Sequence, residues 1–169
     1  MLYLLRHLLS ILILPVTAVI VIPAWLAREY AVTPSWPGDP SGRVALAVGL
    51  ASGLTGLVLF AASLQQFFVD GRGTLAPWDP PRRLVVRGPY RYVRNPMISG
   101  IIFILCGVAL CLRSRPHAAW AAVFIVANLV YIPLLEEPDL ANRFGDAYRR
   151  YRAGVRRFVP RLRPWTDRE

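Results

Sequence analysis

The sequence predicts an all-α, polytopic membrane protein with about four transmembrane helices, followed by an amphipathic helix in the cytosol. Hydrophobic residues make up 55% of the 169 residues, which is high for a soluble domain of this size. Four apolar runs approach the length of about 20 residues that a helix needs to cross a bilayer. After the last run, apolar residues recur at helical spacing with arginines between them.

The four predicted spans are residues 8–27, 44–69, 97–112 and 117–135. The first is too long in its apolar part for a signal peptide, and Pro15 and Pro23 are expected to kink it. Only 113–116 separates the third span from the fourth, which predicts an antiparallel hairpin. We expect residues 1–169 to form a single domain. Its parts are two N-terminal spans (1–69), a cytosolic link (70–96), the hairpin (97–135) and a cytosolic tail (136–169).

The link begins with glycines and prolines that predict a non-helical path, namely Gly71, Gly73, Pro77, Pro80 and Pro81. Gly88 and Pro89 predict a turn nearer its end. Pro96 is suited to the first turn of a helix and is expected to open the third span.

Arginine placement predicts the orientation in the membrane. The chain has ten acidic residues and twenty basic ones, all arginine, for a net charge of +10. Sixteen arginines fall in the N-terminus, the link and the tail, and four fall on the other side. The positive-inside rule therefore predicts an inner (cytoplasmic) membrane protein with both termini in the cytoplasm. Basic residues interleaved with spanning segments indicate anionic membrane lipids as partners and no nucleic acid.

Other small or reactive residues have structural interpretations. Cys106 and Cys111 would point to different sides of one helix and remain unpaired. His7 and His117 are isolated, and no metal-ligand spacing occurs, so no metal is predicted. Gly49 and Gly53 form a G-x-x-x-G pattern that permits close helix contact, either inside the chain or in a homodimer.

The tail predicts an amphipathic helix that begins near Pro138 and ends near Gly154. Glu136 and Glu137 lie just before it, where the fourth span would end. Acidic residues at a helix C-terminus are unfavourable with the helix dipole. We therefore expect a positive group beside them, either tail arginines or a cationic ligand.

Two blocks, "LVVRGPYRYVRNPMISG" from Leu84 and "LLEEPDLANRFGDAYRRYRAGVRRFVP" from Leu134, resemble the isoprenylcysteine carboxyl methyltransferase and phospholipid methyltransferase superfamily. The resemblance covers about residues 82–160. It implies S-adenosylmethionine bound at the cytosolic membrane face, with Glu136 receiving its charged amino-acid end. The other cofactor-binding positions that it implies are Leu84, Val85, Tyr90, Asn95, Pro96, Met97, Ile98, Tyr148 and Tyr151.

The catalytic candidates are Arg94, Asn95 and Glu137. An arginine fork suits the carboxylate of the cofactor or an anionic group of the substrate. Glu137 is the candidate base for a neutral amine or thiol acceptor. Alignment of nucleophile, methyl group and leaving sulfur is the main task of such an enzyme, and can lower the barrier by roughly 7–11 kcal/mol.

This chain departs from the superfamily pattern at three positions. Asn95 stands where histidine is usual, Ile98 where tyrosine is usual, and Ile132 where the prenylcysteine enzymes carry an arginine for the substrate carboxylate. The resemblance thus implies a small lipophilic or membrane-anchored acceptor of open identity. Two alternatives are a non-catalytic membrane scaffold or partner subunit that retains the fold, and a nicotinamide-dependent membrane reductase.

Overall fold

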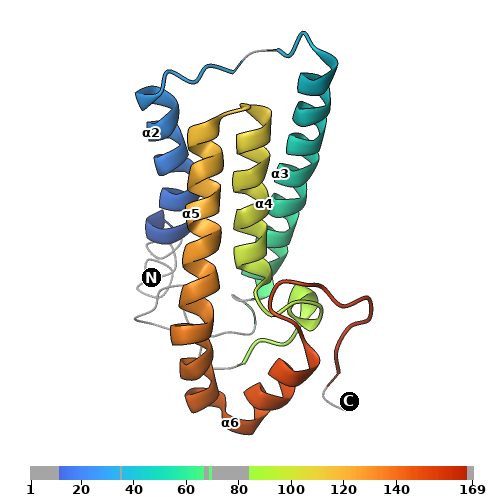
Figure 1. The fold of residues 1–169 in the computed structure, drawn as a ribbon. Coiled ribbons are helices and arrows are strands. Elements are labelled where there is room, and N and C mark those ends of the chain that lie inside the picture. Colours follow the sequence, from blue (N-terminus) through green and yellow to red (C-terminus); the bar gives the residue numbers. More distant parts are fainter. Residues whose placement is uncertain (1–11, 35, 67–68, 70–83, 167–169) are drawn as a thin grey trace. The chain divides into compact units, whose positions relative to one another are not determined.

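All regular secondary structure is helical in the residues that the computed structural model describes, which are 12–34, 36–66, 69 and 84–166. In chain order the elements are η1 (Leu12–Val21), α2 (Ile22–Glu29), α3 (Pro40–Gln66), η3 (Gly88–Arg91), α4 (Pro96–Cys111), α5 (Arg115–Tyr131), η4 (Ile132–Glu136) and α6 (Glu137–Gly154) (Figure 1). The all-α prediction is confirmed for these residues. The glycines and prolines expected to start the link, and His7, lie outside them.

The chain divides into two compact units. Unit 1 consists of Met1–Val58 and Gly100–Val126, and unit 2 of Leu59–Ser99 and Ala127–Glu169. Every residue that the sequence assigned to the cofactor or to catalysis belongs to unit 2. The helices α3, α4 and α5 each contribute residues to both units.

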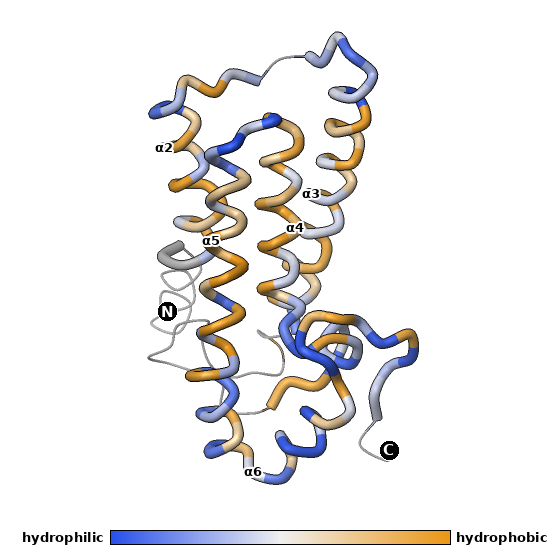
Figure 2. The backbone as a smooth tube through the Cα atoms, viewed as in Figure 1, coloured by the Kyte–Doolittle hydropathy of each residue, from blue (hydrophilic) through white to orange (hydrophobic). Residues whose placement is uncertain are grey.

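Two helical stretches are long and apolar enough to cross a membrane, α3 and the continuous helix Arg115–Gly154, while α4 is a shorter apolar helix. Figure 2 shows hydrophobic residues along much of α3, α4 and α5. In each of these two stretches, only 11% of the most apolar 18-residue segment is buried. Leu54 and Leu134 are 65% and 67% exposed. A soluble protein rarely exposes so much contiguous apolar surface, so this is an integral membrane protein. The full count of four spans remains a prediction, since residues 8–11 of the first span lie outside the described ranges.

Glycines of α3 and α4 pack against each other inside unit 1. A Cβ on Gly49 would lie 2.7 Å from Sγ of Cys111 and 2.8 Å from the carbonyl oxygen of Gly107, and one on Gly56 would lie 2.5 Å from the carbonyl oxygen of Gly100. A Cβ on Gly53 would meet nothing within 4 Å. α4 already covers Gly49, while the homodimer contact through Gly49 and Gly53 stays a prediction. The intramolecular alternative is the one that the structure shows.

Polar contacts join other parts of unit 1. His117 is 3% exposed, and its ring nitrogens lie 2.7 Å from Oγ of Ser114 and 3.1 Å from the carbonyl oxygen of Pro23. Asp39 caps α3 through the backbone N–H of Gly42 at 2.9 Å.

The expected hairpin is confirmed, since residues 112–114 alone separate α4 from α5. Both cysteines are free thiols, as predicted.

The helix that carries the two adjacent glutamates does not end at the membrane boundary. α5 continues through the π turn η4 directly into α6. The prediction that Glu136 and Glu137 close a helix, and that Pro138 opens a new one, is therefore wrong. Pro133 lies within this turn and Pro138 follows it in the first turn of α6. In a regular α-helix, a proline ring collides with the carbonyl four residues earlier. A π turn widens the backbone locally and lets the helix pass both prolines.

α6 bends at Gly145, which has φ 55° and ψ −132° within the helix. Residues with a Cβ rarely adopt this backbone conformation. Space is not the reason for glycine here, because a Cβ would meet nothing within 4 Å. The bend redirects the second half of α6 (Figure 1), and the helix ends at Gly154 as the sequence predicted.

Candidate active site

Two sequence blocks meet in unit 2 through a segment that follows α6. We call residues 155–165 the C-terminal strap. The backbone N–H groups of Arg94 and Asn95 donate to the carbonyl oxygens of Arg156 and Arg157 at 2.9 and 3.3 Å. Further along, Arg161 and Trp165 donate to the carbonyl oxygens of Tyr92 and Arg91, both at 2.9 Å. The strap therefore pairs along residues 91–95.

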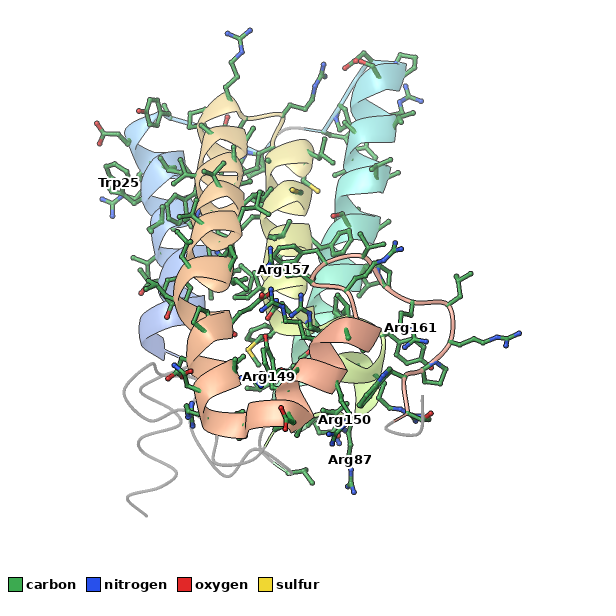
Figure 3. All side chains as sticks on the ribbon, turned by 60° about the horizontal axis from the view of Figure 1, so that its bottom comes forward. Trp25, Arg87, Arg149, Arg150, Arg157 and Arg161 are labelled. Atoms are coloured by element: carbon green, nitrogen blue, oxygen red, sulfur yellow. The ribbon has the colours of Figure 1, made fainter. Side chains whose placement is uncertain are left out.

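Glu137 lies at the centre of an arginine cluster. Its side chain is 2% exposed, and Oε1 accepts a hydrogen bond from Nε of Arg157 at 2.7 Å. Nη1 of Arg94 lies 3.1 Å from the same oxygen, and Nε of Arg152 lies 3.5 Å from Oε2. Figure 3 shows Arg157 turned toward the interior of unit 2, whereas Arg87 points away from it. The cluster joins α6, the strap and the segment before α4.

The pKa of the Glu137 carboxyl reflects this pairing. Burial acts to raise the pKa, but the hydrogen bond from Arg157 and the charges of Arg94, Arg157 and Arg152 outweigh it and hold the pKa below its usual value. An ionised, paired carboxylate is a poor proton acceptor. The geometry thus favours an anchoring role for Glu137 over its expected role as a base.

Glu136, the preceding residue, has a different environment. Burial, and then the charge of Glu137, raise the pKa of its carboxyl to about 7, while Arg157 and Arg94 partly oppose the shift. Across the described ranges, no side chain or backbone group donates a hydrogen bond to this carboxylate or forms an ion pair with it. Of Glu137, only Oε2 lacks a hydrogen-bond donor, and an arginine forms an ion pair with it. Glu136 is therefore the acid of this site that is more available to a ligand.

Tyrosines from both blocks lie near the acidic pair: Tyr90 and Tyr148 interact electrostatically with Glu136, and Tyr151 packs beside Tyr148. Tyr148 and Tyr151 are each 3% exposed and pack in a core with Val155 and Trp165. The Tyr151 hydroxyl donates to the carbonyl oxygen of Tyr90 at 2.7 Å. Burial and the charge of Glu136 raise the pKa of the Tyr90 phenol well above its usual value, so this ring stays neutral. Nη1 of Arg94 lies 3.3 Å from the Tyr148 hydroxyl oxygen.

The remaining predicted positions lie around the start of α4. Asn95 precedes α4, and its carbonyl oxygen accepts from the backbone N–H and the hydroxyl of Ser99 at 3.0 and 2.9 Å. Pro96 opens α4 as predicted and is fully buried, while Met97 and Ile98 are half-buried. Leu84, which precedes η3 in the sequence, packs against the tyrosine core. Val85 is 6% exposed.

Sequence reasoning did not find Arg152, Arg157 or Trp165. Arg152 and Arg157 belong to the second block, but nothing distinguished them from the other arginines of a tail that holds nine after Leu135, and Trp165 lies beyond the block. The sequence predicted Gly154 as the end of the tail helix; in the structure, a Cβ there would also overlap the Trp165 indole. The glycine that ends α6 therefore also admits the returning strap.

Comparisons with known proteins identify the family. The sequence model described as "Phospholipid methyltransferase" matches residues 44–147, which is more than half of the chain, and the chain belongs to this family. It is 32% identical over 85 residues to a protein named phosphatidylethanolamine N-methyltransferase 1 from Vanderwaltozyma polyspora. It is 38% identical over 71 residues to methanethiol S-methyltransferase 1 from Bradyrhizobium diazoefficiens, and 28% over 92 residues to phosphatidylethanolamine N-methyltransferase from Zygosaccharomyces rouxii.

These three alignments cover 50%, 42% and 54% of this chain, but only 10%, 24% and 11% of the relatives. The chain thus spans a small part of each curated relative's length. No solved structure matches it. The resemblance to this group of membrane methyltransferases, inferred from the two sequence blocks, is confirmed.

The residues of unit 2 fit the cofactor that this family implies. S-adenosylmethionine carries an ammonium, a sulfonium and a carboxylate. The Glu136 carboxylate has no partner in the described chain, and Nε of Arg94 is buried without a hydrogen-bond acceptor. Buried polar groups without partners are rare in proteins. Together they offer a negative group for the cofactor's cationic end and a donor for its carboxylate.

Proposed function

We propose that this protein transfers a methyl group from S-adenosylmethionine to a small lipophilic or membrane-anchored acceptor at the cytosolic face of the membrane. The observation that carries the proposal is the contrast between two adjacent acids. Glu137 is held by three arginines. Glu136 is desolvated, has no partner among the described residues, and has a pKa raised to about 7. A perturbed carboxyl of this kind is typical of a functional site.

In this proposal Glu136 binds the cationic amino-acid end of the cofactor with a charge-assisted hydrogen bond. Arg94 donates through its free Nε to the cofactor's carboxylate, while its Nη1 stays with Glu137. Leu84, Val85, Tyr90, Asn95, Pro96, Met97 and Ile98 line the remaining contacts, with Tyr148 and Tyr151 supporting them. When bound, S-adenosylmethionine supplies a methyl group already activated by the sulfonium.

The acceptor differs from prenylcysteine in this account. Ile132, which stands where those enzymes carry a carboxylate-binding arginine, is 1% exposed. A buried isoleucine cannot pair with a carboxylate. The names of the relatives include an amine and a thiol methyltransferase, so an amino headgroup lipid and a small thiol are the two acceptor classes to assay.

Support for the cytosolic location comes from the arginine distribution. The site uses residues from the link and the tail, which carry most of the chain's arginines and are cytoplasmic under the positive-inside rule. Cytosolic S-adenosylmethionine would then reach Glu136 at the end of the apolar part of the long helix.

Thermal unfolding of the purified protein in detergent tests the cofactor assignment. S-adenosylhomocysteine and S-adenosylmethionine should each raise the melting temperature, because a ligand that binds only the native state stabilises it by mass action. NADPH should leave it unchanged. A shift with NADPH alone would favour the reductase alternative, and no shift with any of the three would favour a scaffold.

A further inference from the structure

The C-terminal strap lies beyond the residues that the family model matches, which end at 147. It is nevertheless bound along the whole segment 91–95. Four backbone hydrogen bonds connect the two segments, and Nε of Arg91 adds a fifth contact to the carbonyl oxygen of Trp165 at 2.8 Å. The strap is further fixed at its end by Trp165, whose ring lies edge-on to Tyr151 with centroids 5.5 Å apart.

Arg157 is the strap residue that reaches the acidic pair. It is 27% exposed and donates from Nε to Oε1 of Glu137 at 2.7 Å. Since Arg94 lies 3.1 Å from the same oxygen, the carboxylate bridges the strap to the residue that precedes Asn95. Glu137 thereby joins three segments that are far apart in sequence.

We propose that Arg157 is a positioning residue of the cofactor site: by pairing with Glu137 it fixes the strap and residues 91–95 against the helical turn that carries Glu136. This inference rests on the proposed function, because it concerns the same site. Arg157 contacts neither the reacting atoms nor the cofactor in this account and acts through Glu137.

The charge of Arg157 also acts on Glu136. The ionisable groups that interact with Glu136 are Glu137, Arg157, Arg94, Tyr90 and Tyr148. Loss of the Arg157 charge removes one of the two cations that lower the pKa of the Glu136 carboxyl. A ligand that needs this carboxylate ionised would then require a higher pH.

The test is the dissociation constant of S-adenosylhomocysteine, measured by calorimetry from pH 5.5 to 8.5 on the full chain in detergent. For Arg157→Gln we expect binding weaker by about tenfold at pH 7, since a hydrogen bond to a charged group is lost. The midpoint of the pH dependence should also move upward. Arg163→Gln is the control, because Arg163 is an exposed strap residue with the same charge and should bind as the wild type does.

Arg157→Lys provides a second variant should Arg157→Gln fail to fold. It keeps the charge but replaces the guanidinium donor, so it should weaken binding while leaving the pH midpoint in place. Equal binding by wild type, Arg157→Gln and Arg157→Lys would overturn the proposal. So would an equal loss in Arg157→Gln and Arg163→Gln, which would indicate a general charge effect.

Hydrogen exchange separates this inference from the proposed function. The amides of Arg94, Asn95, Arg161 and Trp165, which donate across the strap, should lose protection in Arg157→Gln and keep it in Arg163→Gln. Wild-type protein that binds no adenosyl ligand would refute the proposed function and the cofactor role of the strap together. Unchanged protection in Arg157→Gln, with ligand binding intact in the wild type, would refute the strap proposal alone.

Discussion

Glu137 and Arg157 lie twenty residues apart in the sequence, yet the carboxylate of the first accepts a hydrogen bond from Nε of the second at 2.7 Å. This contact joins the start of α6 to the C-terminal strap. The neighbouring Glu136 has no such bond within the described residues, and its pKa is raised while that of Glu137 is lowered. The two adjacent acids thus divide into an anchor and a ligand-binding group.

Glu137→Gln should destabilise the fold strongly. Removing one partner of a buried charge cluster typically costs 3–5 kcal/mol, and here Arg94 would remain largely buried beside a neutral amide. We expect a marked fall in the melting temperature in detergent. Asp146→Asn is the matched control, because Asp146 and its partner Arg149 are 79% and 73% exposed and such surface pairs contribute little. Similar melting of both variants would show that Glu137 is no anchor.

Glu136→Gln should stabilise the ligand-free protein at neutral and higher pH. The folded-state pKa of about 7 lies above the ordinary value of 4.5, so the folded state binds the proton more tightly than the unfolded state does. Stability is therefore lost as pH rises through this range, and the amide removes that loss. Melting temperatures of the two proteins should agree near pH 4.5 and diverge by pH 8. Parallel curves would contradict the raised pKa.

Gly145→Ala should lower stability because alanine is strained at φ 55° and ψ −132°. Such a conformation costs roughly 1–3 kcal/mol for a residue with a Cβ. The bend in α6 that brings Tyr148 and Tyr151 to Tyr90 depends on it. Gly38→Ala is the control, since a Cβ there would meet nothing and its φ is not positive. Thermal unfolding compares the melting temperatures of the two variants. Equal melting temperatures would mean that a residue with a Cβ is not strained at position 145.

Gly49→Ala and Gly53→Ala separate helix packing from dimerisation. A Cβ at position 49 would press on Cys111 and Gly107, whereas one at position 53 would lie in open space. Overpacking of this kind typically costs about 1–3 kcal/mol, so only Gly49→Ala should melt earlier. Light scattering in detergent should give the same mass for both variants and the wild type. A loss of mass in both would support the dimer interpretation.

Single prolines and glycines in the sequence correctly predicted where some helices begin and end. Pro96 opens α4 because a first-turn proline loses no helical hydrogen bond, and Gly154 ends α6. The helix across Pro133 and Pro138 was not predicted, because a π turn that accommodates two prolines depends on the whole helix continuing. The end of the apolar run at Leu135, with Pro138 as a helix-opening residue, therefore suggested a break.

The sequence predicted many of the residues of the candidate site, but not how they contact one another. The two blocks that carry Arg94 and Glu136 were identified in the sequence, and the structure brings them together in unit 2. Their separate roles follow from tertiary contacts that no spacing encodes. Arg157 is one of nine tail arginines, and only the path of the strap distinguishes it from the others.

The proposed function depends above all on Glu136 binding the cationic end of an adenosyl cofactor. Calorimetric titration of S-adenosylhomocysteine into wild type and Glu136→Gln at pH 8, both shown to be folded, tests it most directly. The wild type should bind, and the variant should bind at least about tenfold more weakly, since a charge-assisted hydrogen bond to the ligand is worth roughly 1.5–3 kcal/mol. An unchanged dissociation constant in Glu136→Gln would contradict this role of Glu136.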